Sequence, residues 1–517
     1  MWVALLVLLT ISAFVNGDVK VALLGHPDRH LGVLTWVLFF ALFCAGQQLT
    51  DQVRTLARCA VVAGALTSVY SVWELLFGPP VSIDASTRRL VGPLGSAAFL
   101  GAACCLLGPI AVGVAFDRSE DRSWRRISAG VAFLTAVSVV GSGTRAAWFG
   151  LLIAAAVAVI AVQPRWRSIA CCTAGVLVAV AIVAPRLSDV TTRSEGTGSR
   201  LDEWRIGTRV IDMHPMTGVG PEGYRIAVSE GIDDVYERAY RRDTVLPDRA
   251  HSGPLDVALA GGVGAGLLYV ALIGFVGWRA WLAIRSRRAL AAGLACAVIA
   301  YGAQQLLLFP LAELDPVWWV LAGVVVASTT VAEPIVHRRT IVPALAATAS
   351  IIMLVAGVLD VAADRQARTA LRAVDHDVSV DAARRAVTLR PDNLRYRLVA
   401  ANALLDRGTL ADIDAAIAEA REATEWSAND PFAADELATA MSRRAAATGD
   451  RADVNAAFAQ WRALTARDPH RASWQLQFGR AAALAGDAAT ARKAFLAAAD
   501  LGEPGARELL AQLDASS

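Results

Sequence analysis

Long apolar runs fill the first 360 residues of this 517-residue chain. Most of them are roughly 17 to 25 residues long, the length that an α-helix needs to cross about 30 Å of hydrocarbon. After residue 360 no such run occurs, and the sequence becomes rich in Ala, Arg, Asp and Glu. The sequence therefore predicts an all-α protein, with a polytopic membrane helix bundle over residues 1–360 and a soluble helical domain over residues 361–517.

The membrane domain is expected to contain about 11 spans. The first run, residues 1–17, has the length of a signal peptide, but it lacks a basic segment and many spans follow it. We therefore interpret it as the first span. The expected spans are residues 2–17, 31–48, 56–78, 93–116, 127–141, 146–163, 168–185, 254–282, 289–310, 316–333 and 341–360.

Arginines in the short loops predict the orientation of these spans. Cytoplasmic loops are enriched in Lys and Arg, and the Arg-rich loops are 117–126, 163–168, 283–289 and 334–340. All four alternate correctly if they are cytoplasmic. The N-terminus is then cytoplasmic, while a long loop at about 186–253 and the C-terminal domain lie outside. Arg88 and Arg89 fall on the outer side against this rule, which indicates either an anion contact or chance.

Charge and cysteine content exclude some classes of function. The net charge is only +2, which gives no indication of nucleic-acid binding. All seven Cys fall inside apolar runs and none has the spacing of metal ligands, so we interpret them as packing residues rather than a disulfide framework. The sequence predicts no metal site and no cofactor.

The soluble tail has a repeating pattern. Pro391, Pro431, Pro469 and Pro504 recur at spacings of 40, 38 and 35 residues, and each follows an Ala-rich helical segment. Turn sequences that contain Gly separate the helices of each pair. A helix–turn–helix unit with a terminal Pro and a period near 34 is typical of tetratricopeptide-like repeats, so we expect an α-solenoid of about three units. Such arrays bind peptides or proteins in a concave groove, and a plain helical spacer is the alternative.

One stretch of the outer loop is unusually polar for this domain: "SRLDEWRIGTRVIDMHPMTGVG", residues 199–220. Ser199 and Asp202 have the spacing of a capping box, which predicts a helix from about Arg200 to Asp212. Arg200 and Trp204, four residues apart, would share one face of it. The expected apolar stripe, which would lie on the membrane domain, consists of Leu201, Trp204, Thr208 and Ile211. Three glycines would allow a tight turn after the helix: Gly218, Gly220 and Gly223.

Two more polar groups stand at the outer ends of spans. Arg145 lies in "GSGTRAAWFG", and His251 lies in "DRAHSGPLDVALAGG". Taken singly, such an Arg can reach lipid headgroups, and such a His is by default solvated. Together with Arg200 they suit an anionic lipid-linked donor, because Arg pairs with phosphate oxygens and can stabilise a departing pyrophosphate without a metal. A neutral His can accept the proton of an attacking hydroxyl.

The order of these motifs resembles that of a known family. The segments that carry the likeness are "RLVGPLGSAAFLGA" (89–102), "GSGTRAAWFGLLIAA" (141–155), "GSRLDEWRIGTRVIDMHPMTGVGPEGYR" (198–225) and "AHSGPLDVALAGGVGAGLLYVALI" (250–273). They resemble the O-antigen ligase and O-antigen polymerase superfamily of membrane glycosyltransferases, mainly over residues 85–320. The outer loop contains no D-x-D, H-E-x-x-H, Walker or G-x-S-x-G sequence, which argues against nucleotide-driven or zinc chemistry there.

The resemblance implies a reaction and a set of site residues. Family members transfer a glycan from an undecaprenyl-pyrophosphate carrier to an acceptor hydroxyl on the outer side of the bacterial cytoplasmic membrane, and they need no metal. By this likeness Arg145 and Arg200 would bind the pyrophosphate, and His251 would activate the hydroxyl of a glycan, lipid or protein. Arg89, Trp204 and Ser252 are possible additional site residues. The family usually has Asn where this chain has Ser252.

Two other functions remain open from the sequence. A non-catalytic membrane scaffold would use the repeats to recruit partners for cell-envelope assembly. A transporter would need acidic or broken-helix sites near the middle of the membrane, and the sequence offers only Glu74, Glu313 and Asp315. Within the enzyme hypothesis, the sequence does not separate a ligase from a polymerase or a protein O-glycosyltransferase.

Overall fold

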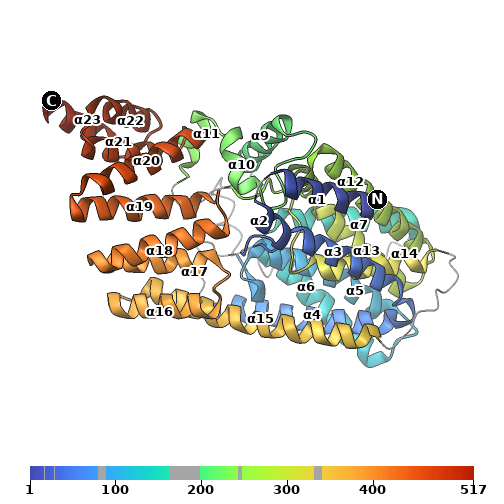
Figure 1. Cartoon of the computed structure of the whole chain (residues 1–517). Coiled ribbons are helices and arrows are strands. Elements are labelled where there is room, and N and C mark those ends of the chain that lie inside the picture. Colours follow the sequence, from blue (N-terminus) through green and yellow to red (C-terminus); the bar gives the residue numbers. More distant parts are fainter. Residues whose placement is uncertain are drawn as a thin grey trace.

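The computed structural model describes residues 1–16, 18–27, 29–79, 89–162, 198–242, 247–330 and 341–516. Across these ranges every regular element is a helix and no strand occurs, which confirms the predicted all-α class. The helices form a bundle that contains the N-terminus and a stack that contains the C-terminus, and α15 (Ile341–Arg372) runs along the edge of both (Figure 1).

Helices lie at the expected positions of the spans wherever the structure describes them. The expected span at 168–185 and the Arg-rich loops at 163–168 and 334–340 lie outside the described residues, as does Arg88. The bundle consists of α1 (Trp2–Val15), the short α2 (Val19–Leu24), α3 (Val33–Gln47), α4 (Val53–Phe77), α5 (Ala97–Phe116), α6 (Arg122–Ser142), α7 (Arg145–Val162), α12 (Gly253–Arg285), α13 (Ala289–Gln304) and α14 (Asp315–Ser328).

Three segments of the described chain are long and apolar enough to cross a membrane. They are Thr50–Phe77, Ala97–Phe116 and Gly253–Arg285. Five further apolar helices in the bundle are shorter, with α1 and α14 among them. The model therefore supports a membrane domain, and the expected total of about 11 spans stays a prediction.

The second half of the outer loop forms a small helical subdomain. It contains α9 (Gly198–Met213), α10 (Tyr224–Gly231) and α11 (Asp234–Tyr240). α9 covers the helix that the sequence predicts at Arg200–Asp212. Its buried residues pack with α10 and the first turns of α12 in one apolar cluster, which includes Ile206, Val210, Ile211, Tyr224, Val228 and Leu259.

Two details predicted for α9 are wrong. Leu201 is 60% exposed and Thr208 is exposed, so the apolar stripe does not run through them. The buried face is set instead by contact with α10, and it carries Ile206 and Val210, four residues apart. The helix begins at Gly198, before Ser199, so the capping box does not mark its start. Asp202 instead accepts a hydrogen bond from the Tyr240 hydroxyl at 2.6 Å.

The glycines after α9 allow its turn to insert into a break in α12. Gly261 and Gly262 leave the helical conformation, and Gly262 has φ +83°. At this break the Val219 N–H donates to the Leu259 carbonyl at 2.7 Å, and the Val263 N–H donates to the Pro215 carbonyl at 2.9 Å. A Cβ atom on Gly262 would lie 2.3 Å from the Met216 oxygen, so only glycine fits. The turn thus supplies hydrogen-bond partners for a carbonyl and an N–H group of α12 that the break leaves without helical partners.

The soluble tail is a stack of helices in which each packs mainly against its neighbours in sequence (Figure 1). Gly408 and Gly449 end α17 and α19 in the left-handed conformation, at the turns that the sequence indicates. The assignment to tetratricopeptide-like repeats stays a prediction. After α15 the helices are α16 (His376–Leu389), α17 (Leu394–Arg407), α18 (Leu410–Trp426), α19 (Pro431–Thr448), α20 (Arg451–Arg467), α21 (Ala472–Leu484), α22 (Ala488–Asp500) and α23 (Ala506–Ser516).

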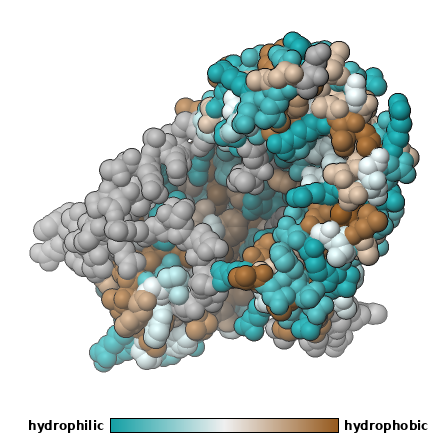
Figure 2. All heavy atoms as spheres, turned by 90° about the vertical axis from the view of Figure 1, so that its left-hand side faces the viewer, coloured by the Kyte–Doolittle hydropathy of each residue, from teal (hydrophilic) through white to brown (hydrophobic). Residues whose placement is uncertain are grey.

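The stack contacts the outer-loop subdomain through charged groups. The Arg225 Nε lies 3.1 Å from Asp430, and Nδ1 of His470 lies 2.6 Å from Asp234. Seen from the side of the stack, the surface mixes hydrophilic and hydrophobic residues and is hollowed near its centre (Figure 2). The outer loop and the C-terminal domain therefore lie at the same end of the membrane bundle.

Candidate active site

Arg89 and Arg145 lie together at one end of the bundle. The Arg89 Nε donates to the Ser142 carbonyl at 2.6 Å, and its Nη2 donates to Thr144 Oγ1 at 3.3 Å. The Leu90 N–H donates to the Gly141 carbonyl at 3.0 Å. These bonds hold the segment before α5 against the turn between α6 and α7. Arg145 is the first residue of α7.

Arg200 joins this pair from the first turns of α9. Burial lowers the pKa of Arg89, and the charges of Arg200 and Arg145 lower it further. Burial also lowers the pKa of Arg200; Glu203 opposes that shift and Arg145 adds to it. Three guanidinium groups from three distant segments are thus close enough to repel one another. No carboxylate of the described residues forms an ion pair with Arg89 or Arg200, so a bound anion would relieve the repulsion.

His251 is held in a strained turn before α12. It has φ +52°, which is uncommon for a residue other than glycine. The Asp256 carboxylate accepts the Ala250 N–H at 2.8 Å and the Ser252 N–H at 3.3 Å. On the other side, the Gly253 N–H donates to the Gln305 carbonyl at 2.7 Å. These bonds fix the backbone on both sides of His251.

Glu203 faces the imidazole of His251. Its Oε2 lies 2.9 Å from Nδ1, both atoms are buried, and neither has another hydrogen-bond partner among the described residues. Burial lowers the pKa of His251, but the Glu203 carboxylate outweighs this effect and holds the pKa above its ordinary value. Because Glu203 lies one turn after Arg200 on α9, the same helix carries a cation of the cluster and the partner of the imidazole.

The segment 305–309, between α13 and α14, contacts both Arg200 of α9 and the turn that carries His251. The Leu307 carbonyl accepts from Arg200 Nη1 at 3.4 Å, and the Leu308 carbonyl accepts from the Gly253 N–H at 2.9 Å. The Phe309 ring packs edge-on against His251, with centroids 5.3 Å apart. Sequence reasoning does not find this segment, because three of its contacts with the site, those of residues 305, 307 and 308, come from backbone carbonyls.

Trp204 and Ser252 are neighbours in sequence of the paired site residues: Trp204 follows Glu203 on α9, and Ser252 follows His251. The Trp204 side chain is partly buried, and its Nε1 is buried without a hydrogen-bond partner among the described residues. Ser252 is 6% exposed and precedes α12, and its hydroxyl makes no capping bond there. The structure thus brings all six residues expected in the site to one end of the bundle. Their roles stay predictions.

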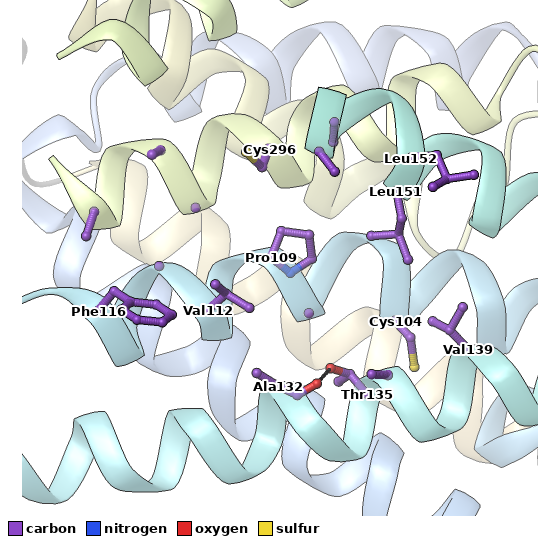
Figure 3. Close-up of a pocket in the computed structure, with 18 of the residues that line it drawn as sticks. Cys104, Pro109, Val112, Phe116, Ala132, Thr135, Val139, Leu151, Leu152 and Cys296 are labelled. Carbon is purple, nitrogen blue, oxygen red and sulfur yellow. Dashed lines mark hydrogen bonds between the residues drawn. The ribbon is translucent and has the colours of Figure 1, made fainter. Parts of the chain in front are cut away.

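An apolar cavity of about 510 Å³ lies within the bundle. Its lining comes from α5, α6, α7 and α13, and it includes Pro109, Val139 and Leu151, whose side chains gather between these helices (Figure 3). Trp148 also lines it, one turn after Arg145 on α7. The cavity therefore begins about one helical turn from the cation cluster.

Comparison with known proteins gives one match. No curated protein matches the chain. The model of a family described as O-antigen ligase matches residues 130–270. This range includes Arg145, Arg200, Glu203 and His251 and excludes Arg89 and the C-terminal stack. The match over residues 130–270, together with the apolar helices, supports the resemblance to the O-antigen ligase superfamily and a bacterial membrane protein.

Proposed function

We propose that the protein transfers a glycan from an undecaprenyl-pyrophosphate carrier to an acceptor hydroxyl on the outer side of the cytoplasmic membrane. The observation that carries this proposal is the convergence of Arg89, Arg145 and Arg200 near His251. Three mutually repelling guanidinium groups form a site that favours a multiply charged anion.

The arginines hold the pyrophosphate of the donor. Arg presents a planar fork to phosphate oxygens, and its charge stabilises the diphosphate as it leaves. The apolar cavity accepts the start of the polyprenyl chain, because Trp148 in its wall lies one turn from Arg145. A pyrophosphate at the cation cluster and a hydrocarbon chain in the cavity together match an amphipathic, lipid-linked donor. In this mechanism the guanidinium groups supply the positive charge, and no metal or cofactor is used.

His251 activates the acceptor. Glu203 engages Nδ1, which leaves Nε2 to accept the proton of the acceptor hydroxyl. The hydroxyl oxygen attacks the anomeric carbon, the bond from that carbon to the diphosphate oxygen breaks, and its electron pair leaves with the diphosphate. A single displacement of this kind inverts the anomeric centre. The acceptor is a hydroxyl of a glycan, a lipid or a protein.

In this proposal the N-terminus is cytoplasmic and the C-terminal stack is outside. The charged contacts between the stack and the outer-loop subdomain support this arrangement, since they put both at one end of the bundle. The stack is tetratricopeptide-like and binds a protein partner on its free surface.

Replacement of the site residues tests the proposal. We expect His251→Ala and Arg145→Ala each to abolish surface glycan while the protein stays in the membrane at its normal level. His376→Ala and Arg384→Ala, at exposed positions of α16, are matched controls that should keep normal glycan. Normal glycan in both site variants would refute the enzyme hypothesis. Loss of glycan only when residues 365–517 are deleted would favour a scaffold.

The same His251→Ala strain separates two versions of the reaction. Accumulated long lipid-linked polymer would mean that the protein is a ligase. Accumulated single repeat units would mean that it is a polymerase.

A further inference from the structure

A second cavity lies at the end of the bundle opposite His251. α12 begins beside His251 and ends at Arg285, so its last turn is at the far end. There the ends of α5, α12 and α14 meet the starts of α4 and α13 around a cavity of about 1070 Å³. Nothing in the proposed transfer reaction uses this space.

Three exposed arginines border the cavity. Arg118 follows α5, and Arg287 and Arg288 form the turn between α12 and α13. None of the three forms an ion pair with a carboxylate of the described chain, although Asp51 and Asp117 also line the cavity. Arg54 differs from them, because it pairs with Glu120 at 2.7 Å. The rim of the cavity therefore carries three arginines that form no ion pair within the described chain, and they outnumber its two aspartates.

The backbone at Arg287 adopts a left-handed conformation. Arg287 has φ +59° just past the end of α12, a position where glycine is favoured because it has no Cβ. A non-glycine residue in this conformation is destabilising relative to glycine. The chain accepts this cost and holds a guanidinium group at the rim of the cavity.

The inner wall of the cavity is apolar. Phe116, Leu290 and Leu294 line it, together with the buried Val324 and Val325 of α14. Cationic groups at the membrane surface and hydrocarbon walls below them match a ligand that joins an anionic headgroup to acyl chains. A free phosphate would satisfy only the arginines and would leave the apolar wall uncovered.

We propose that this cavity binds one anionic phospholipid, with its phosphate on Arg118, Arg287 and Arg288 and an acyl chain against Leu290 and Leu294. In the predicted orientation this end of the bundle faces the cytoplasm, where the lipid surface is negatively charged. Phe116 and Ala289 line both this cavity and the one proposed for the polyprenyl chain, but the three arginines lie outside the proposed transfer site. Binding of a lipid to these arginines can therefore be tested independently of the transfer reaction.

Lipid retention measured by native mass spectrometry tests the site directly. The purified full-length chain is mixed in detergent with phosphatidylglycerol or with phosphatidylcholine that has the same acyl chains. We expect one phosphatidylglycerol to be retained per chain and phosphatidylcholine to be lost. The triple variant Arg118→Gln, Arg287→Gln, Arg288→Gln should retain phosphatidylglycerol at least tenfold less well.

Two controls make the result decisive. The double variant Arg384→Gln, Arg385→Gln removes exposed arginines from α16 and should retain the lipid like the unaltered chain. The thermal unfolding temperature without added lipid shows whether the triple variant is folded. The proposal is wrong if the triple variant retains phosphatidylglycerol as well as the unaltered chain does. It is also wrong if millimolar inorganic phosphate displaces phosphatidylglycerol from the unaltered chain, because the cavity would then be a small-anion site.

Discussion

Arg242, at the end of the outer-loop subdomain, pairs with Asp468, between α20 and α21. Nη1 lies 2.7 Å from Oδ2 and Nη2 lies 3.2 Å from Oδ1, and the two side chains are only 1% and 5% exposed. Glu237 of α11 accepts from Arg242 Nε and also from the Ala472 N–H at 3.0 Å. This buried network fixes the C-terminal stack to the outer loop.

We predict that Asp468→Asn loosens the junction between the stack and the outer loop. The substitution removes one of the two carboxylates that contact the buried Arg242 and leaves Glu237 as the other, at a cost of about 1–3 kcal/mol. Hydrogen exchange of the full-length chain should accelerate in α11 and at the start of α21. Asp453→Asn removes a partly buried carboxylate of α20 that pairs with Arg444, away from the junction; it is the control and should leave α11 unchanged. Unchanged exchange in Asp468→Asn would show that the ion pair does not hold the junction.

For Arg200 we predict that the transfer rate depends on the planar shape of its guanidinium group as well as on its charge. Arg200→Ala should lower the transfer rate from a lipid-linked donor about 100-fold, since a hydrogen bond to a charged group contributes about 1.5–3 kcal/mol. Arg200→Lys should retain part of the rate, because it keeps the charge and loses the planar fork. An in vitro transfer assay measures both. Arg205→Ala, an exposed position of the same helix, is the matched control. A loss of rate in Arg205→Ala equal to that in Arg200→Ala would contradict a specific role for Arg200.

Replacing Glu203 should shift the pH profile of transfer. The Glu203 carboxylate holds the pKa of His251 above its ordinary value, so Glu203→Gln should lower that pKa. The neutral imidazole then forms at lower pH, and the acidic limb of the rate profile moves to lower pH. We also expect a slower maximal rate, because the base is weaker and less well oriented. Asp202→Asn, next along the helix, should leave the limb in place. An unshifted limb in Glu203→Gln would exclude a contact between this carboxylate and the base.

The break in α12 gives a prediction about folding. Gly262→Ala should displace the turn at 215–219, because its Cβ would lie 2.3 Å from the Met216 oxygen at a positive φ. A cost of about 1–3 kcal/mol is expected from the backbone conformation alone. Limited proteolysis should then cut faster between α9 and α10. Gly264→Ala is the control, since its Cβ would make an ordinary contact of 3.5 Å with Leu8. Equal protection of both variants would mean that the turn does not depend on the break.

The sequence predicts the helices well and the contacts between them poorly. Each expected span is one apolar run, so its position does not depend on tertiary packing. The buried face of α9 does depend on packing: spacing alone selects Thr208, whereas contact with α10 selects Ile206 and Val210.

The candidate site likewise contains residues that the sequence indicates and residues that it does not. Arg145, Arg200 and His251 stand out in the sequence because they are charged or titratable groups beside apolar runs. Glu203 lies between two of the residues singled out, and its only signal is its place one turn after Arg200. Asp256 does have a signal, an acidic side chain in the first turn of a helix, where it can accept backbone N–H groups. The segment 305–309 has none, because it acts largely through carbonyl groups that every residue possesses.

The placement of Arg200 and Glu203 on one rigid helix has a consequence for the timing of the reaction. In the proposed mechanism, a diphosphate that draws Arg200 inward carries Glu203 with it and so changes the contact between the Glu203 carboxylate and the His251 imidazole. Donor binding and the positioning of the His251 base are therefore coupled, in this mechanism, through one helix.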